Sequence, residues 1–118
     1  MKLAVTVWGN RISPVFDAAS TLLVAEIKNK KIAGQYYTAF DPQSPVDLIH
    51  TLKKNHVAIL VCGAISKTPA SLILDQQIHL ISLVTGNVRQ FLDSFALKQT
   101  VGKKYRMPGF QQTHMNVC

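Results

Sequence analysis

Cysteine, acidic residues and long apolar runs are all scarce in this chain of 118 residues. Its two cysteines, Cys62 and Cys118, are too few for the disulfide framework that many small secreted domains need. The longest apolar runs, such as VAILVCGAI, are too short to span a bilayer. Met1 and Lys2 lead directly into a strand-like alternation instead of a signal peptide. We therefore expect a cytoplasmic protein with no membrane partner.

Basic residues outnumber acidic ones, with 13 Lys and Arg against 6 Asp and Glu and a formal net charge of +7. The basic side chains cluster at residues 28–31, 53–54 and 103–106. This balance favours an anionic partner, either nucleic acid, phosphate or an anionic cofactor, and solubility alone is the other explanation. The aromatic residues do not interleave with the basic ones as a single-strand stacking platform would require, so nucleic acid is the less favoured partner.

An apolar content of 47% is enough for a buried core, and the length suits one domain. Five segments have the patterns of strands, namely 2–8, 21–29, 31–40, 56–63 and 78–86. A turn signal at Asn29 and Lys30 predicts a hairpin between the second and third. The last two segments are almost continuously apolar, which is typical of parallel strands buried on both faces.

Three helices are expected among these strands. Ser44 can cap the first, with Pro45 at its first position, and this helix ends near Asn55. Thr68 is the expected cap of the second helix, with Pro69 at its first position. The apolar positions at helical spacing are Val46, Ile49 and Leu52 in the first helix, Leu72 and Ile73 in the second, and Val88, Phe91, Leu92 and Phe95 in the third.

The resulting order, β-β-β-α-β-α-β-α, predicts a mixed α/β fold. Each of the last two strands is connected to the strand before it by a helix, and such a connection requires parallel pairing with a right-handed crossover. We expect a five-stranded sheet of order 3-2-1-4-5 with helices on both faces, and an open edge at the third strand that allows a homodimer. Residues 1–102 form a single α/β cofactor-binding-like domain in this interpretation, and residues 103–118 form its C-terminal tail.

Three polar loops leave the carboxyl ends of the parallel strands, where open α/β sheets bind ligands. They are GNRISPVFD, GAISKT and TGN, and the first belongs to a stretch, 10–20, far longer than a tight hairpin needs. The other two lead into helix N-termini, where free N–H groups favour an anion, and Arg11 adds a fork of donors. The residues expected to bind a cofactor there are Asn10, Arg11, Ser13, Gly63, Ala64, Ser66, Thr68, Thr85, Gly86 and Asn87.

The chain contains, in this order, the segments KLAVTVWGNRISPVFDAASTLLVAEI, ILVCGAIS, LVTGNV and YRMPG. Together they resemble the dinitrogenase iron–molybdenum cofactor biosynthesis family, with its NifX-like and NifB C-terminal-like domains, as far as Gly109. The resemblance implies a ribonuclease-H-like fold. It also implies that the protein binds or carries an iron–sulfur or molybdenum–iron–sulfur cluster during cofactor assembly, with assembly proteins as partners.

Two positions depart from the pattern that the resemblance implies. Nitrogenase-linked members are expected to have a His before the Phe of the first loop, where this chain has Val15. A His could ligate or hydrogen-bond a cluster, whereas a Val cannot. Relatives are also expected to follow MPG with a Cys, where this chain has Phe110. Direct ligation at these two positions is therefore not expected.

The candidate metal ligands are Cys62, His114 and Cys118. Cys62 ends a buried strand, where it is either a small core hydrophobe or a ligand at the carboxyl edge of the sheet. His114 and Cys118 lie in the tail, which either closes over a cluster or frays as termini commonly do. The chain has no CxxC and no HxxxH spacing, so a closed zinc or iron–sulfur site is not expected.

No catalytic constellation is evident. A ribonuclease-H-type nuclease needs several carboxylates at adjacent strand ends, but the segments LAVTVW and VAILVC contain no acid. A Ser or Cys nucleophile needs a His base, and the three loops contain none. We therefore expect a non-catalytic binding or carrier protein for an anionic metal–sulfur cluster. The alternative is an anion-binding, nucleic-acid-binding or protein-docking module that keeps the fold without a cluster.

Overall fold

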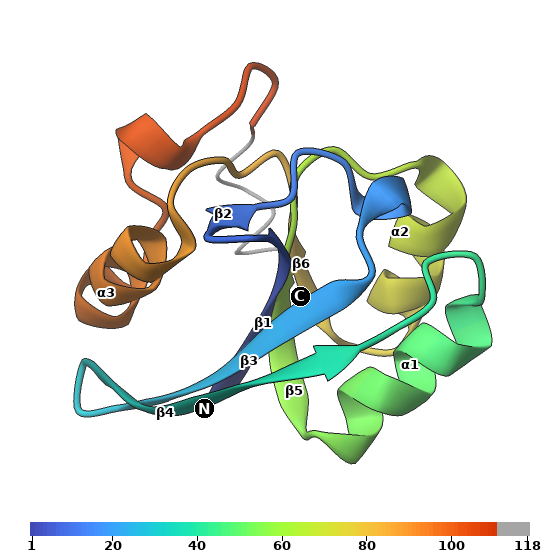
Figure 1. Cartoon of the computed structure of the whole chain (residues 1–118), viewed down its shortest axis with the longest axis horizontal. Helices are drawn as coiled ribbons and strands as arrows, with labels where there is room; N and C mark the ends of the chain where they lie inside the picture. The colour runs from blue at the N-terminus through green and yellow to red at the C-terminus, as the bar shows by residue number, and fades with distance from the viewer. Residues whose placement is uncertain (111–118) are drawn as a thin grey trace.

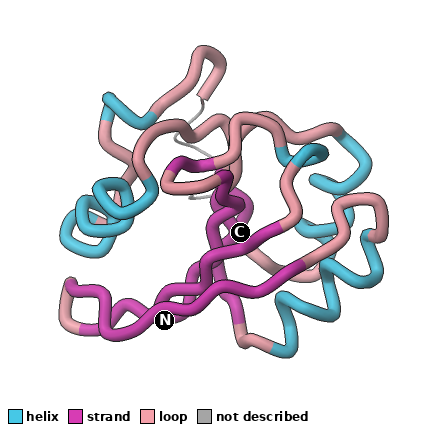
Figure 2. Tube along the Cα trace, viewed as in Figure 1, coloured by secondary structure: helices cyan, strands magenta, loops and turns pink. Residues whose placement is uncertain are grey.

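The computed structural model describes residues 1–110 and shows one sheet with helices on both of its faces (Figures 1 and 2). The strands are Lys2–Trp8 (β1), Arg11–Ile12 (β2), Thr21–Lys28 (β3), Lys31–Ala39 (β4), Val57–Val61 (β5) and His79–Ile81 (β6). The helices are Pro45–Lys54 (α1), Lys67–Asp75 (α2) and Val88–Lys98 (α3), with 3₁₀ turns at Phe16–Ala18 (η1) and Lys103–Tyr105 (η2). None of these helices is long and apolar enough to cross a membrane.

The strand order β4-β3-β1-β5-β6 confirms the predicted order 3-2-1-4-5. β1 pairs antiparallel with β3 and parallel with β5, so it lies at the centre of the sheet. The predicted count of five strands is wrong, because the short strand β2 pairs with the end of β1 and makes a sixth. Gly9, with a φ of +63°, allows the two-residue turn that brings Arg11 opposite Trp8. A two-residue strand has no periodicity, so its pattern could not be read from the sequence.

Alternate residues of β1 enter two separate cores. Leu3, Val5 and Val7 pack into the core beneath α3, while Ala4 packs into the core beneath α1 and α2. The four predicted apolar positions of α3 are all buried, which confirms that stripe. The first core extends past the helix, since the ring of Tyr105 meets that of Phe91 edge-on at 5.5 Å. Residues near Tyr105 are therefore part of the packed domain.

Helix α1 begins and ends as predicted, with Ser44 as its N-cap, Pro45 at its first position and Asn55 at its C-cap. Its buried residues are Leu48 and Leu52, however, and Val46 is 80% exposed. Val46 lies two residues before Leu48, which is about 200° around the helix, so it points away from the face that Leu48 and Leu52 bury.

Helix α2 begins one residue after Ser66, so the prediction of Thr68 as its cap is wrong. Pro69 is then the third helical residue, which the fold tolerates because first-turn N–H groups have no intrahelical acceptor. Ile73 is fully buried as predicted, whereas Leu72 is exposed.

Replacement of the α1 cap tests these helix boundaries. Ser44 accepts a hydrogen bond from the N–H of Asp47, whereas Ser66 makes no side-chain cap bond. We expect Ser44→Ala to lower the free energy of unfolding by about 1 kcal/mol. Ser66→Ala, the matched control, should change it by about 0.5 kcal/mol or less. Urea denaturation measures both, and equal losses would contradict the assigned caps.

Candidate functional site

The three loops expected to form the crevice do meet at one end of the sheet, beyond the carboxyl ends of the parallel strands, at the top of Figure 1. The first loop bonds to the second, because Phe16 N donates to the Ala64 carbonyl at 2.7 Å and Ala64 N donates to the Pro14 carbonyl at 2.8 Å. It bonds to the third where Ile12 N donates to the Gly86 carbonyl at 2.9 Å. The second and third are joined by Leu83 N, which donates to the Gly63 carbonyl at 2.9 Å. We call this set of contacts the loop ladder.

Further backbone donors near the loop ladder, which were expected to be free for an anion, are also used within the protein. At the start of α3, Val88 N donates to the Asn10 carbonyl and Gln90 N donates to Asn87 Oδ1, both at 3.0 Å. Thr85 N donates to the Tyr105 carbonyl at 2.8 Å. The expectation of an open amide cradle at this helix is therefore wrong, because backbone groups at a packed edge must find partners within the protein. Ala64 and Gly86 are members of the loop ladder, and the N–H of Thr85 is used beside it.

Gly63 allows the closest approach within the ladder. A Cβ at this position would lie 2.3 Å from the carbonyl oxygen of Pro14 and 2.4 Å from that of Ser13. Any side chain would therefore push the first and second loops apart. Gly63 shapes the crevice through backbone packing and is buried beneath it.

Ser13 is also buried, with 1% of its surface exposed. Its Oγ donates to the Val15 carbonyl at 2.9 Å, and its N–H donates to the Thr6 carbonyl. Both donors are used within the protein, so the structure gives Ser13 a role in holding the first loop, and does not place its hydroxyl on the crevice surface.

The start of α2 is exposed but already faces a carboxylate. Ser66 Oγ donates to Asp17 Oδ1 at 3.2 Å, and Thr68 lies on the exposed first turn. Asp17 thus lies beside a helix N-terminus, where a negative charge is favourable. A second anion at this helix would be repelled by that carboxylate.

Cys62 lies in the core beneath α1 and α2 and is fully buried. Burial raises the pKa of its thiol, and the carboxylate of Asp17 raises it further. A thiol that stays protonated is a poor metal ligand. Within residues 1–110 no three His, Cys, Asp or Glu side chains come together as a metal site would require. His114 and Cys118 lie outside the described residues, so their ligand role stays a prediction.

Arg11 and its neighbours remain exposed at the turn between β1 and β2. Arg11 and Trp8 line a hollow of about 400 Å³ together with Gly9, Ile12 and Pro14. The indole of Trp8 is 72% exposed, which is unusual for so large an apolar side chain. Within the part of the chain that the structure describes, Arg11 makes no ion pair.

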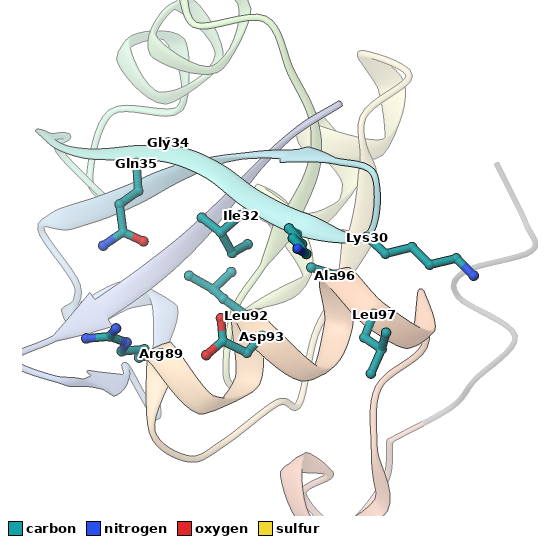
Figure 3. A pocket seen from close by; sticks show the side chains of 10 residues that line it. Lys30, Ile32, Gly34, Gln35, Arg89, Leu92, Asp93, Ala96 and Leu97 are labelled. Carbon is teal, nitrogen blue, oxygen red and sulfur yellow. The ribbon is translucent and has the colours of Figure 1, made fainter.

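On the other side of this turn a groove runs between α3 and β4, and we call it the α3 groove. One hollow of about 500 Å³ includes Asn10, Asn87 and Arg89, and a second of about 620 Å³ includes Lys30 and Lys31. The two hollows share Gln35, Arg89 and Asp93. Figure 3 shows Gln35 and Ile32 pointing from β4 toward Arg89, Leu92 and Asp93 on the helix. Three basic side chains and one acidic side chain thus border an apolar floor.

The sequence interpretation missed Arg89 and the part of β4 that faces it. Arg89 lies outside the buried stripe of α3, so its exposure could have been deduced from the helical spacing. Its approach to Gln35 could not, because that contact depends on how α3 packs across the β3–β4 hairpin.

Comparison with known proteins supports this architecture. The family model described as dinitrogenase iron-molybdenum cofactor matches residues 1–98. No curated protein matches the chain.

Solved structures of low sequence identity share the fold. PH0822 is similar with a TM-score of 0.73 and 16% identity, over 81% of this chain and 90% of that one. MJ0327, a candidate dinitrogenase from Methanocaldococcus jannaschii, has a TM-score of 0.65 and 17% identity in its crystal structure, over 86% and 92% of the two chains. Its NMR structure has a TM-score of 0.64 and 15% identity, over 94% and 95%.

The loop ladder can be tested by adding one methyl group to Gly63. We expect Gly63→Ala to lower the free energy of unfolding by about 1–3 kcal/mol, because the methyl group collides with backbone that cannot move aside cheaply. Gly34→Ala is the control, since a Cβ there meets no atom within 4 Å and should cost about 0.5 kcal/mol or less. Similar urea midpoints for the two variants would contradict the ladder.

Thiol labelling tests the position of Cys62. In Cys118→Ser protein Cys62 is the one remaining cysteine. We expect a thiol reagent to modify it only after unfolding at about pH 8, because the native thiol is buried and protonated. Rapid labelling of the native protein would show that Cys62 is accessible and would restore it as a candidate ligand.

Proposed function

The chain belongs to the dinitrogenase iron-molybdenum cofactor family, and on that premise we propose that it binds and carries an anionic iron–sulfur or molybdenum–iron–sulfur cluster. The protein is a carrier in this proposal and catalyses no reaction on the cluster. Its partners are then the cluster itself and the assembly proteins that deliver and receive it.

The observation that carries the proposal is the exposed guanidinium of Arg11, which makes no ion pair within residues 1–110 and lies on a turn fixed by the loop ladder. A guanidinium presents five donors in a rigid fork and keeps its charge at all relevant pH values. Asn10 lies beside it, and the adjoining α3 groove adds Arg89. The net charge of +7 attracts an anionic cargo before contact is made.

The described residues suit a cluster held by charge and hydrogen bonds instead of metal–ligand bonds. Within residues 1–110 no set of three metal-binding side chains comes together, and the thiol of Cys62 is buried. Val15, which replaces the expected His, is 42% exposed at the edge beside Ala64. It offers an apolar contact there and no ligand. Such a site releases its cargo more readily than one with several thiolate bonds, which suits a carrier.

Anaerobic reconstitution tests the proposal. The protein is incubated with iron, sulfide and molybdate, desalted, and examined for visible absorption and bound metal. We expect absorption to survive desalting, and we expect Arg11→Ala to weaken retention by roughly tenfold or more because it removes a charge-assisted contact. Lys30→Ala removes an equal charge from the far end of the α3 groove and should have a smaller effect.

Two results would contradict this assignment. Equal losses in the two variants would mean that total charge, and not the turn at Arg11, determines retention. Absence of any retained cluster, together with binding to heparin that falls steeply with salt, would favour the alternative of an anion-binding module without a cluster.

A further inference from the structure

The two edges of the sheet differ in how well they are protected against pairing with another strand. β6, at one edge, has only three residues, and short edge strands are a common protection. β4, at the other edge, has nine residues and is exposed along most of its length (Figure 1). Its residues 32–39 include no charge and no proline, although the chain is rich in basic residues. Its first residue is Lys31, and a bulge leaves Ala33 out of the pairing with β3, but residues 34–39 continue as a regular, uncharged edge.

We propose that β4 pairs antiparallel with β4 of a second copy of the chain about a two-fold axis near Tyr36. Two identical antiparallel strands present the same residues to each other, so the contact closes as a dimer and does not propagate. The sheet then continues from one copy into the next through backbone hydrogen bonds. This surface is separate from Arg11 and does not depend on the cluster.

Opposite charges lie at the two ends of β4. Lys30 and Lys31 lie at its start, and Asp41 follows its end. In an antiparallel pair centred on Tyr36, the bulge at residue 33 shifts Lys31 by one position, and Lys31 of each copy then lies near Asp41 of the other, so two favourable contacts form. A parallel pair would instead place the lysines of the two copies side by side. The charge pattern thus favours the antiparallel arrangement specifically.

Tyr36 is held in a position that suits this axis. Its hydroxyl donates to Asn55 Oδ1 at 2.5 Å, at the end of α1, while the side chain remains 42% exposed. The two-fold axis places the Tyr36 rings of the two copies next to each other, and aromatic cross-strand pairs stabilise antiparallel sheets. Because the hydrogen bond already orders the ring, pairing costs little further side-chain entropy.

A mixing experiment with charge-reversed variants tests the dimer. Sedimentation velocity should show a monomer–dimer equilibrium for the natural chain. Lys31→Glu alone and Asp41→Lys alone should each raise the dissociation constant roughly tenfold, since each places two like-charge pairs across the axis. An equimolar mixture of the two variants should recover the dimer, because both contacts then join opposite charges, and native mass spectrometry should identify it as the heterodimer.

Mixing Lys103→Glu with Asp75→Lys, which change the same charges on exposed residues away from β4, is the matched control and should produce no preference for the heterodimer. Local damage from Asp41→Lys, which loses its bond to the N–H of Gln43, would not be repaired by mixing. A natural chain that stays monomeric at every concentration would overturn the proposal. Dimers that form equally well from each variant alone would place the interface elsewhere.

Discussion

Backbone contact between the first two loops is the constraint on which the functional edge depends. The carbonyl oxygen of Pro14 lies 2.3 Å from the position that a Cβ on residue 63 would take, so the two loops approach this closely only because residue 63 is glycine. The reciprocal bonds between residues 14–16 and Ala64 then fix the loop that carries Arg11. The backbone at this edge is therefore positioned by pairing between the loops.

The same pairing changes the chemistry expected of the edge. Amides at the carboxyl ends of parallel strands commonly bind anions, but here they donate to carbonyls of neighbouring loops. In the proposed carrier, a negative charge is therefore recognised by side chains that project from the fixed backbone, chiefly Arg11 and Arg89. Such groups form charge-assisted hydrogen bonds without a rearrangement of the loops.

Position within the sheet gives its strands different roles. β1 is central and buried on both faces, so the packing of two cores fixes the strand from which the first loop begins. β4 is the edge strand, and most of its residues are exposed, so in the proposed dimer it is the strand that pairs with another chain. One sheet thus separates the proposed cargo site from the proposed dimer contact.

Local sequence patterns determined the strands other than β2, the three helices and the order of the sheet, because periodicity and crossover rules act over short stretches or limit the topology as a whole. They also placed the three loops at one edge. The pairing of β2, the burial of Ser13 and the groove beside Arg89 were decided by the tertiary structure. β2 pairs with Val7 and Trp8, which are close in sequence, but a strand of two residues has no periodicity to read. The loop that covers Ser13 and the strand that faces Arg89 come from distant parts of the chain, and no local pattern states which side chains such elements will cover.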